Sequence, residues 1–111
     1  MSTPPSDREV RIAANEVHFR SINDRLAADL RPVVADVDGE LVDFVCECGH
    51  PSCTEALRMT LREYGRVHED PMRFAVRAGH ELADVEEVVA RNDRYHVVRK
   101  LETMRDVVER P

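Results

Sequence analysis

The chain has 111 residues, a length that suits one compact domain with a single hydrophobic core. Apolar residues make up 42% and charged residues 34%, with three phenylalanines, two tyrosines and no tryptophan, so the core must rely on Val, Leu and Ala. The net charge of −6 opposes binding to the phosphate backbone of nucleic acids and so argues against DNA or RNA as a partner.

Residues 1–5 are expected to form a flexible leader, since they contain two prolines and lead into polar residues without an apolar signal segment. The sequence also lacks any apolar run long enough to cross a membrane. We therefore expect a cytoplasmic protein without membrane contact. Three cysteines without a secretion signal argue against a disulfide framework and favour reduced thiols or a metal site.

Residues 6–31 predict a long N-terminal helix. Ser6 and Glu9 match a capping box, and Pro32 ends the segment. Five large apolar residues share one stripe at helical spacing: Ile12, Phe19, Ile22, Leu26 and Leu30. We expect this amphipathic stripe to be buried on the protein's own sheet. The alternative is contact with an unknown protein partner, or with a second copy of the chain in a homodimer.

Residues 32–100 predict an α+β core. The connector 32–40 contains an Asp-Gly turn, and residues 41–45 read as a strand that leads into the cysteines. Residues 56–59 are expected to return as the second strand of a hairpin. Thr60 and Glu63 form a second capping box, which predicts a short helix over 61–68.

The last part of the core predicts more antiparallel sheet. Residues 73–77 alternate like a strand, and Asn92-Asp93 favours a hairpin between Val88-Val89 and residues 95–98. The tail 101–111 has helical spacing and is expected to be helical or frayed. The predicted fold is thus α+β: a long N-terminal helix, a small antiparallel sheet and a short helix, held together by a metal site.

All three cysteines lie close together as Cys46, Cys48 and Cys53. Structural zinc is bound by four protein ligands and accepts three thiolates with one imidazole. In an extended segment Cys46 and Cys48 point the same way, and a loop with Gly49 can bring Cys53 back towards them. The sequence therefore predicts Zn²⁺ held by these cysteines and a fourth ligand from elsewhere.

The predicted fourth ligand is His80, because it follows a glycine at the end of a strand and would tie two parts of the fold together. His50, inside the cysteine segment, is the rival candidate. The other candidates are the histidines His68 and His96, the carboxylates of Glu47 and Glu81, and a water molecule.

Other interpretations of the cysteines remain open. Three reduced thiols can be buried as small apolar side chains without a function. A thiol-redox role is also open, although Glu47 and the acidic composition are expected to raise the thiol pKa values and so to oppose it. An iron–sulfur cluster of the CDGSH type does not fit, because Leu57 stands where that pattern has its histidine.

A wider set of residues resembles a family of small uncharacterised bacterial proteins. The set is Phe44–Glu55 with its CxCx4C spacing, Thr60–Tyr64, Asp70-Pro71, Arg73-Phe74 and Gly79–Glu81. The resemblance covers roughly residues 40–100 and implies a recurrent zinc-binding module. It implies no catalytic residue.

The expected function is that of a non-enzymatic zinc protein, acting as a protein-interaction or regulatory module. Four protein ligands leave no open position for a substrate, and the sequence contains no phosphate-binding loop, nucleophile elbow or HExxH motif. One alternative is a zinc or thiol-redox sensor. Another is a DNA-associated transcriptional regulator that uses the arginine-bearing helix.

Overall fold

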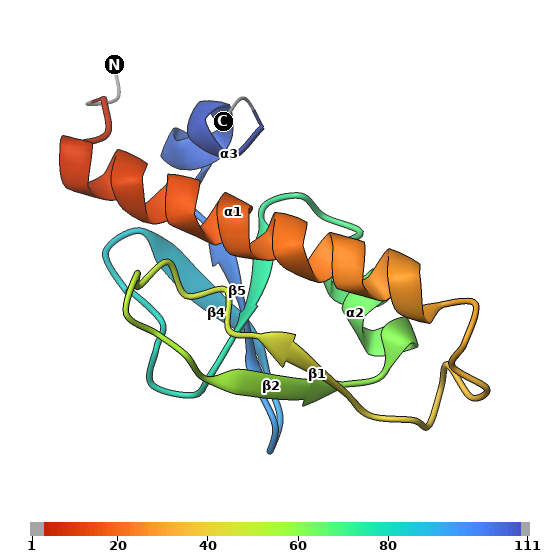
Figure 1. Ribbon diagram of the computed structural model, residues 1–111. Coiled ribbons are helices and arrows are strands. Elements are labelled where there is room, and N and C mark those ends of the chain that lie inside the picture. The colour runs from red at the N-terminus through yellow and green to blue at the C-terminus, as the bar shows by residue number, and fades with distance from the viewer. Residues whose placement is uncertain (1–3, 110–111) are drawn as a thin grey trace.

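The computed structural model describes residues 4–109 and has the predicted α+β architecture. One long helix, α1, lies across strands and shorter helices that belong to the rest of the chain (Figure 1). Residues 1–3 of the predicted leader and 110–111 of the predicted tail lie outside the described residues.

The helix α1 spans Asp7–Leu30, and its predicted start and end are confirmed. The backbone N–H of Glu9 donates to Ser6 Oγ at 3.2 Å, and the backbone N–H of Ser6 donates to Glu9 Oε1 at 3.1 Å. This capping box satisfies two of the N–H groups that a helix start leaves free. Arg31 forms the C-cap directly before Pro32.

The predicted apolar stripe of α1 is buried only in part. Ile22 is 42% exposed, and the other four members of the stripe are half-buried, with Leu26 and Leu30 packed against the core. The fully buried residues of the helix are two alanines and two polar residues: Ala13, Glu16, Asn23 and Ala27. Small alanines let the helix backbone approach the chain beneath it, and the two polar side chains meet buried polar partners there.

The strands β1 (Val42–Val45) and β2 (Ala56–Met59) form the predicted hairpin. They pair antiparallel, with Val42 opposite Met59 and Phe44 opposite Leu57. The cysteines lie in the loop between them. The helix α2 (Leu61–Val67) follows β2, and its predicted capping box is confirmed by hydrogen bonds of 3.0 and 2.9 Å between Thr60 and Glu63.

Three further strands form a second sheet in the order β3-β5-β4. Their bounds are Arg73–Val76 for β3, Glu86–Arg91 for β4 and His96–Lys100 for β5. The predicted hairpin around Asn92-Asp93 is confirmed as β4–β5, with longer arms than expected and an irregularity between Val88 and Ala90. The tail continues as η1 (Glu102–Met104) and α3 (Arg105–Glu109), so it is helical up to Glu109.

The sequence predicted one small sheet, whereas the structure has two. They meet where β1 ends: the backbone N–H of Glu47 donates to the Ala75 carbonyl at 2.9 Å, and the N–H of Ala75 donates to Glu47 Oε1 at 2.8 Å. Ala75 belongs to β3 of the second sheet. The cysteine segment therefore lies where the two sheets join.

The core lies between α1, α2 and the two sheets. Phe44 of β1 and Tyr64 of α2 stack with ring centroids 4.5 Å apart, and Leu57, Met59 and Phe74 are fully buried around them. Burial of this apolar surface is the main driving force for the fold. No helix within residues 4–109 is both long and apolar enough to span a bilayer.

A buried charged triad joins α1 to the second sheet. Lys100 Nζ lies 2.7 Å from Glu16 Oε1 of α1 and 3.2 Å from Glu86 Oε1 of β4, and all three side chains are almost fully buried. Burial, and next the charge of Glu86, hold the pKa of Glu16 well above its usual range. Two carboxylates thus share one ammonium group inside the protein.

Candidate metal centre

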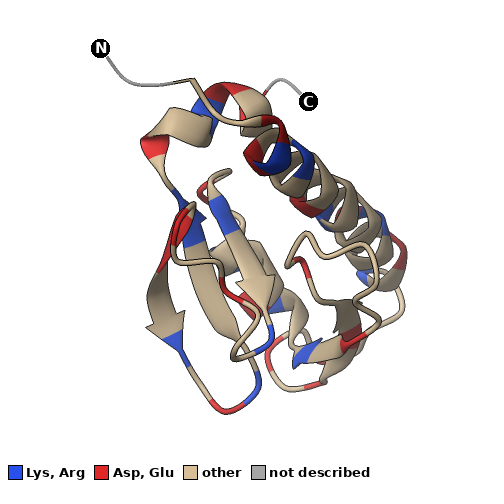
Figure 2. Ribbon diagram, turned by 90° about the vertical axis from the view of Figure 1, so that its left-hand side faces the viewer, with Lys and Arg blue, Asp and Glu red and all other residues tan. Residues whose placement is uncertain are grey.

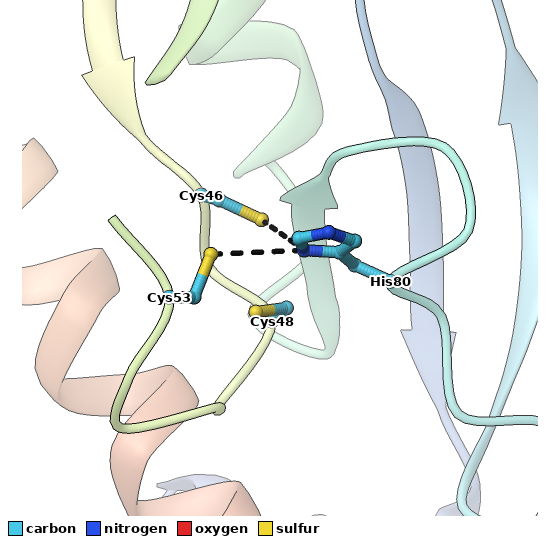
Figure 3. Close-up of side chains that lie close together, drawn as sticks. All are labelled: Cys46, Cys48, Cys53 and His80. Carbon is cyan, nitrogen blue, oxygen red and sulfur yellow. Dashed lines mark hydrogen bonds between the residues drawn. The ribbon is translucent and has the colours of Figure 1, made fainter. Parts of the chain in front are cut away.

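Three separate segments bring four potential metal ligands together. Cys46 and Cys48 follow the end of β1, Cys53 comes from the loop that leads to β2, and His80 comes from the turn after β3 (Figure 3). These are the four residues that the sequence predicted. Their candidate ligand atoms all lie within 4.8 Å of one another.

The distances fit a tetrahedral metal site. The Sγ atoms of Cys46 and Cys53 each lie 3.6 Å from His80 Nδ1 (Figure 3). Tetrahedral zinc with a Zn–S distance of about 2.3 Å and a Zn–N distance of about 2.05 Å has S···N edges of about 3.6 Å. The cluster could therefore hold a metal ion with little movement of these atoms.

The thiols have unequal pKa values without a metal. A hydrogen bond from Cys46 lowers the pKa of Cys48 to about 4. The same hydrogen bond, together with burial, raises the pKa of Cys46, and burial raises the pKa of Cys53. A metal ion that binds all three thiolates must therefore displace protons from Cys46 and Cys53.

Backbone groups also support the sulfurs. The N–H of Arg77 donates to Cys46 Sγ at 3.3 Å, and the backbone N–H groups of His50 and Glu55 donate to the sulfurs of Cys48 and Cys53 respectively. Such bonds stabilise thiolate charge and orient the ligands. Each sulfur thus has a donor from the chain that surrounds it.

Gly49 allows the metal loop, residues 46–53, to lie directly against α1. Its φ is +78°, a conformation that side chains disfavour, and an added Cβ would lie 2.8 Å from the Ile12 carbonyl oxygen and 2.9 Å from Glu16 Cγ. The side-chain amide of Asn15 donates to the Gly49 carbonyl at 3.0 Å. The loop and the helix are therefore packed backbone to backbone.

Gly49→Ala is expected to lower the free energy of unfolding more than Gly79→Ala. Gly79 also has a positive φ, +90°, and, like Gly49, is adjacent in sequence to a proposed ligand, but an added Cβ there would have no atom within 4 Å. Both variants carry backbone strain of about 1–3 kcal/mol. Only Gly49→Ala adds the clash with α1, for about another 1–3 kcal/mol. Urea unfolding of the zinc-saturated proteins measures the difference, and equal losses would show that α1 does not pack on the loop.

Glu47, between two of the cysteines, does not join the metal ligands. Its fully buried carboxylate accepts a hydrogen bond from Asn23 Nδ2 at 2.8 Å as well as the one from Ala75, and lies 3.1 Å from His68 Nε2. Asn23 also exchanges two hydrogen bonds of 2.9 Å with the backbone of Val45. Alternation along the extended segment sends Glu47 towards α1 and α2 while its neighbours face the metal site.

The expectation that Glu47 raises the thiol pKa values was wrong. A hydrogen bond from Cys46 lowers the pKa of Cys48, and the raised pKa values of Cys46 and Cys53 come from hydrogen bonding within the cluster and from burial. Asn23 and Glu47 form a polar connection between α1 and the metal loop that sequence reasoning missed. The only sequence signal was an Asn and a Glu at positions that a simple apolar pattern would leave to solvent.

The rival ligands lie elsewhere. His50 is exposed, His68 lies beside Glu47, and His96 Nδ1 lies 3.1 Å from Glu81 Oε1. Among the described residues, the group that brings together metal-binding atoms contains His80 and none of these alternatives.

No family model, no curated protein and no solved structure matches the chain. The resemblance to a bacterial family therefore stays a prediction.

Proposed function

We propose that this protein binds one Zn²⁺ through Cys46, Cys48, Cys53 and His80. The observation that carries the proposal is the pair of 3.6 Å distances from His80 Nδ1 to two sulfurs, which equals the edge of a zinc tetrahedron. Three thiolates and an imidazole are soft and borderline donors that suit zinc better than Mg²⁺ or Ca²⁺.

The zinc site is structural and the protein is not an enzyme. A full set of four protein ligands leaves no position for substrate or activated water. Two of the sulfurs are buried, Cys46 at 2% and Cys48 at 0% exposure, which also suits a closed site. The ion would supply cross-linking between the hairpin and the turn after β3 rather than chemistry on a substrate.

Metal analysis of the purified protein tests this proposal. The native chain is expected to carry about one zinc per chain, and His80→Ala is expected to lose it or to bind it at least about tenfold more weakly. His50→Ala is the matched control, because His50 lies in the metal loop but outside the ligand cluster. Equal zinc retention in the two variants, or no zinc in the native chain, would refute the ligand set.

The proposed role is that of an interaction or regulatory module in the cytoplasm, where reduced thiols persist. The outer side of α1 exposes Val10 and Ile22 among charges of both signs, which follow one another along the helix (Figure 2). This surface would receive a protein partner or a second copy of the chain.

Light scattering of the native protein and of Ile22→Asp tests the homodimer. The added charge is expected to weaken a dimer that forms through this surface. A monomer in both cases would remove the homodimer option.

Of the alternatives, a redox-sensing role gains support from the uneven exposure of the three sulfurs. A role in DNA binding has no comparable support: α1 mixes arginines with acidic residues, and the whole chain is negative (Figure 2).

A further inference from the structure

The three cysteines differ in access from solvent. Cys46 and Cys48 are buried, whereas Cys53 is only partly buried and lines a surface cavity of about 290 Å³. His80 lines the same cavity, as do His50 and Ser52 of the metal loop. Of the three cysteines, Cys53 alone lines this cavity, so a small molecule in the cavity meets Cys53 before the two buried cysteines.

Backbone hydrogen bonding does not make one sulfur more reactive toward an oxidant than the others, because each sulfur has a backbone donor nearby, from Arg77, His50 or Glu55. Oxidation of cysteine depends on thiolate character and on exposure. In the zinc-bound state all three are thiolates, so exposure alone distinguishes them. Cys53 is then the sulfur that an electrophile meets first.

We propose that Cys53 is an oxidation site at which a small hydroperoxide, such as hydrogen peroxide, opens the metal cluster. This inference rests on the proposed zinc site and adds a redox-controlled release of its ion. The cavity beside Cys53 and His80 is large enough for a peroxide and its surrounding water.

The chemistry balances in two steps. The Cys53 thiolate attacks the nearer peroxide oxygen, the O–O bond breaks, and a sulfenic acid and hydroxide form. A thiolate of Cys46 or Cys48, within 4.8 Å, then attacks the Cys53 sulfur and displaces a second hydroxide to give a disulfide. Two thiolates are oxidised by two electrons in total, and one peroxide is reduced. The disulfide removes two of the four metal ligands.

The experiment treats the zinc-loaded protein with hydrogen peroxide, follows zinc release with a coloured chelator and locates the modified cysteines by mass spectrometry after rapid quenching. Early samples are expected to carry sulfenate or disulfide on Cys53 at a level at least about tenfold above sulfenate on either buried cysteine. Zinc release should follow, and a thiol reductant with added zinc should restore the starting state. Zinc retained under excess peroxide, or first oxidation at Cys46 or Cys48, would overturn the proposal.

Two variants that keep every ligand test the role of access. Ser52→Phe places a large side chain at the cavity and is expected to slow zinc release at least about threefold. Thr54→Phe adds the same side chain on the other side of Cys53, at an exposed position outside the cavity, and should leave the rate unchanged. Equal rates in the two variants would show that the cavity is not the route.

Zinc content is measured before peroxide is added, so that the two proposals can fail separately. Absence of zinc refutes the metal site, whereas bound zinc with unaltered Cys53 refutes only this inference.

Discussion

Removal of zinc by a strong chelator is expected to unfold most of the protein. Structural zinc sites contribute an apparent free energy of about 10–16 kcal/mol at neutral pH, which is comparable to the total stability of about 5–15 kcal/mol for a domain of this size. The site joins the β1–β2 hairpin to the turn after β3, and α1 rests on the same loop. Circular dichroism should show loss of the helical signal, and the unfolding temperature should rise with free zinc.

Three controls separate this effect from damage by the chelator. Zinc added back should restore the signal, whereas magnesium should not, because it prefers oxygen ligands. Cys48→Ser should behave like the chelated protein even in the presence of zinc, since Cys48 is fully buried at the site. A chelated protein that keeps its helical signal and its unfolding midpoint would show that the apolar core alone sustains the fold.

Lys100→Met is expected to lower the free energy of unfolding by about 3–5 kcal/mol at pH 7–8, because the variant leaves two buried carboxylates without their shared cation. Urea unfolding measures the loss. Arg58→Met is the matched control: Arg58 pairs with Asp43 at 3.4 Å, but both side chains are largely exposed, so the cost should stay below about 1 kcal/mol. Similar losses in both variants would contradict the buried triad.

The triad also predicts a pH dependence. The folded-state pKa of Glu16 lies above its ordinary value of 4.5, so the folded protein binds more protons than the unfolded chain above that pH. The contribution of Glu16 to stability therefore falls as pH rises from about 4.5 towards the folded pKa. Glu16→Gln should remove this fall, and Lys100→Met should steepen it. Unfolding curves between pH 5 and pH 8 that stay parallel for all three proteins would refute this assignment.

Local signals in the sequence predicted most of the secondary structure. The two capping boxes at Ser6 and Thr60 act within one turn of a helix, so their residues define the helix starts without help from distant contacts. The hairpin around Asn92-Asp93 was predicted for the same reason. The cysteine cluster and His80 were predictable because metal ligands are few and chemically distinctive.

The orientation of α1 could not be predicted from its own apolar residues. The helix buries Glu16 and Asn23 because they pair with Lys100 and the Val45–Glu47 segment. These partners are distant in sequence, so the helix sequence alone does not reveal them. A pattern that ranks residues by hydropathy places such side chains in solvent. The separation of the strands into two sheets also depends on the contact of Glu47 with Ala75, which no local pattern indicates.

The measurement that tests the central claim most directly is zinc K-edge X-ray absorption on the purified protein. The proposed site predicts three sulfur ligands at about 2.3 Å and one nitrogen ligand at about 2.0 Å, with the nitrogen signal lost in His80→Ala and kept in His50→Ala. Coordination dominated by oxygen, fewer than three sulfurs, or a nitrogen signal that survives in His80→Ala would contradict it.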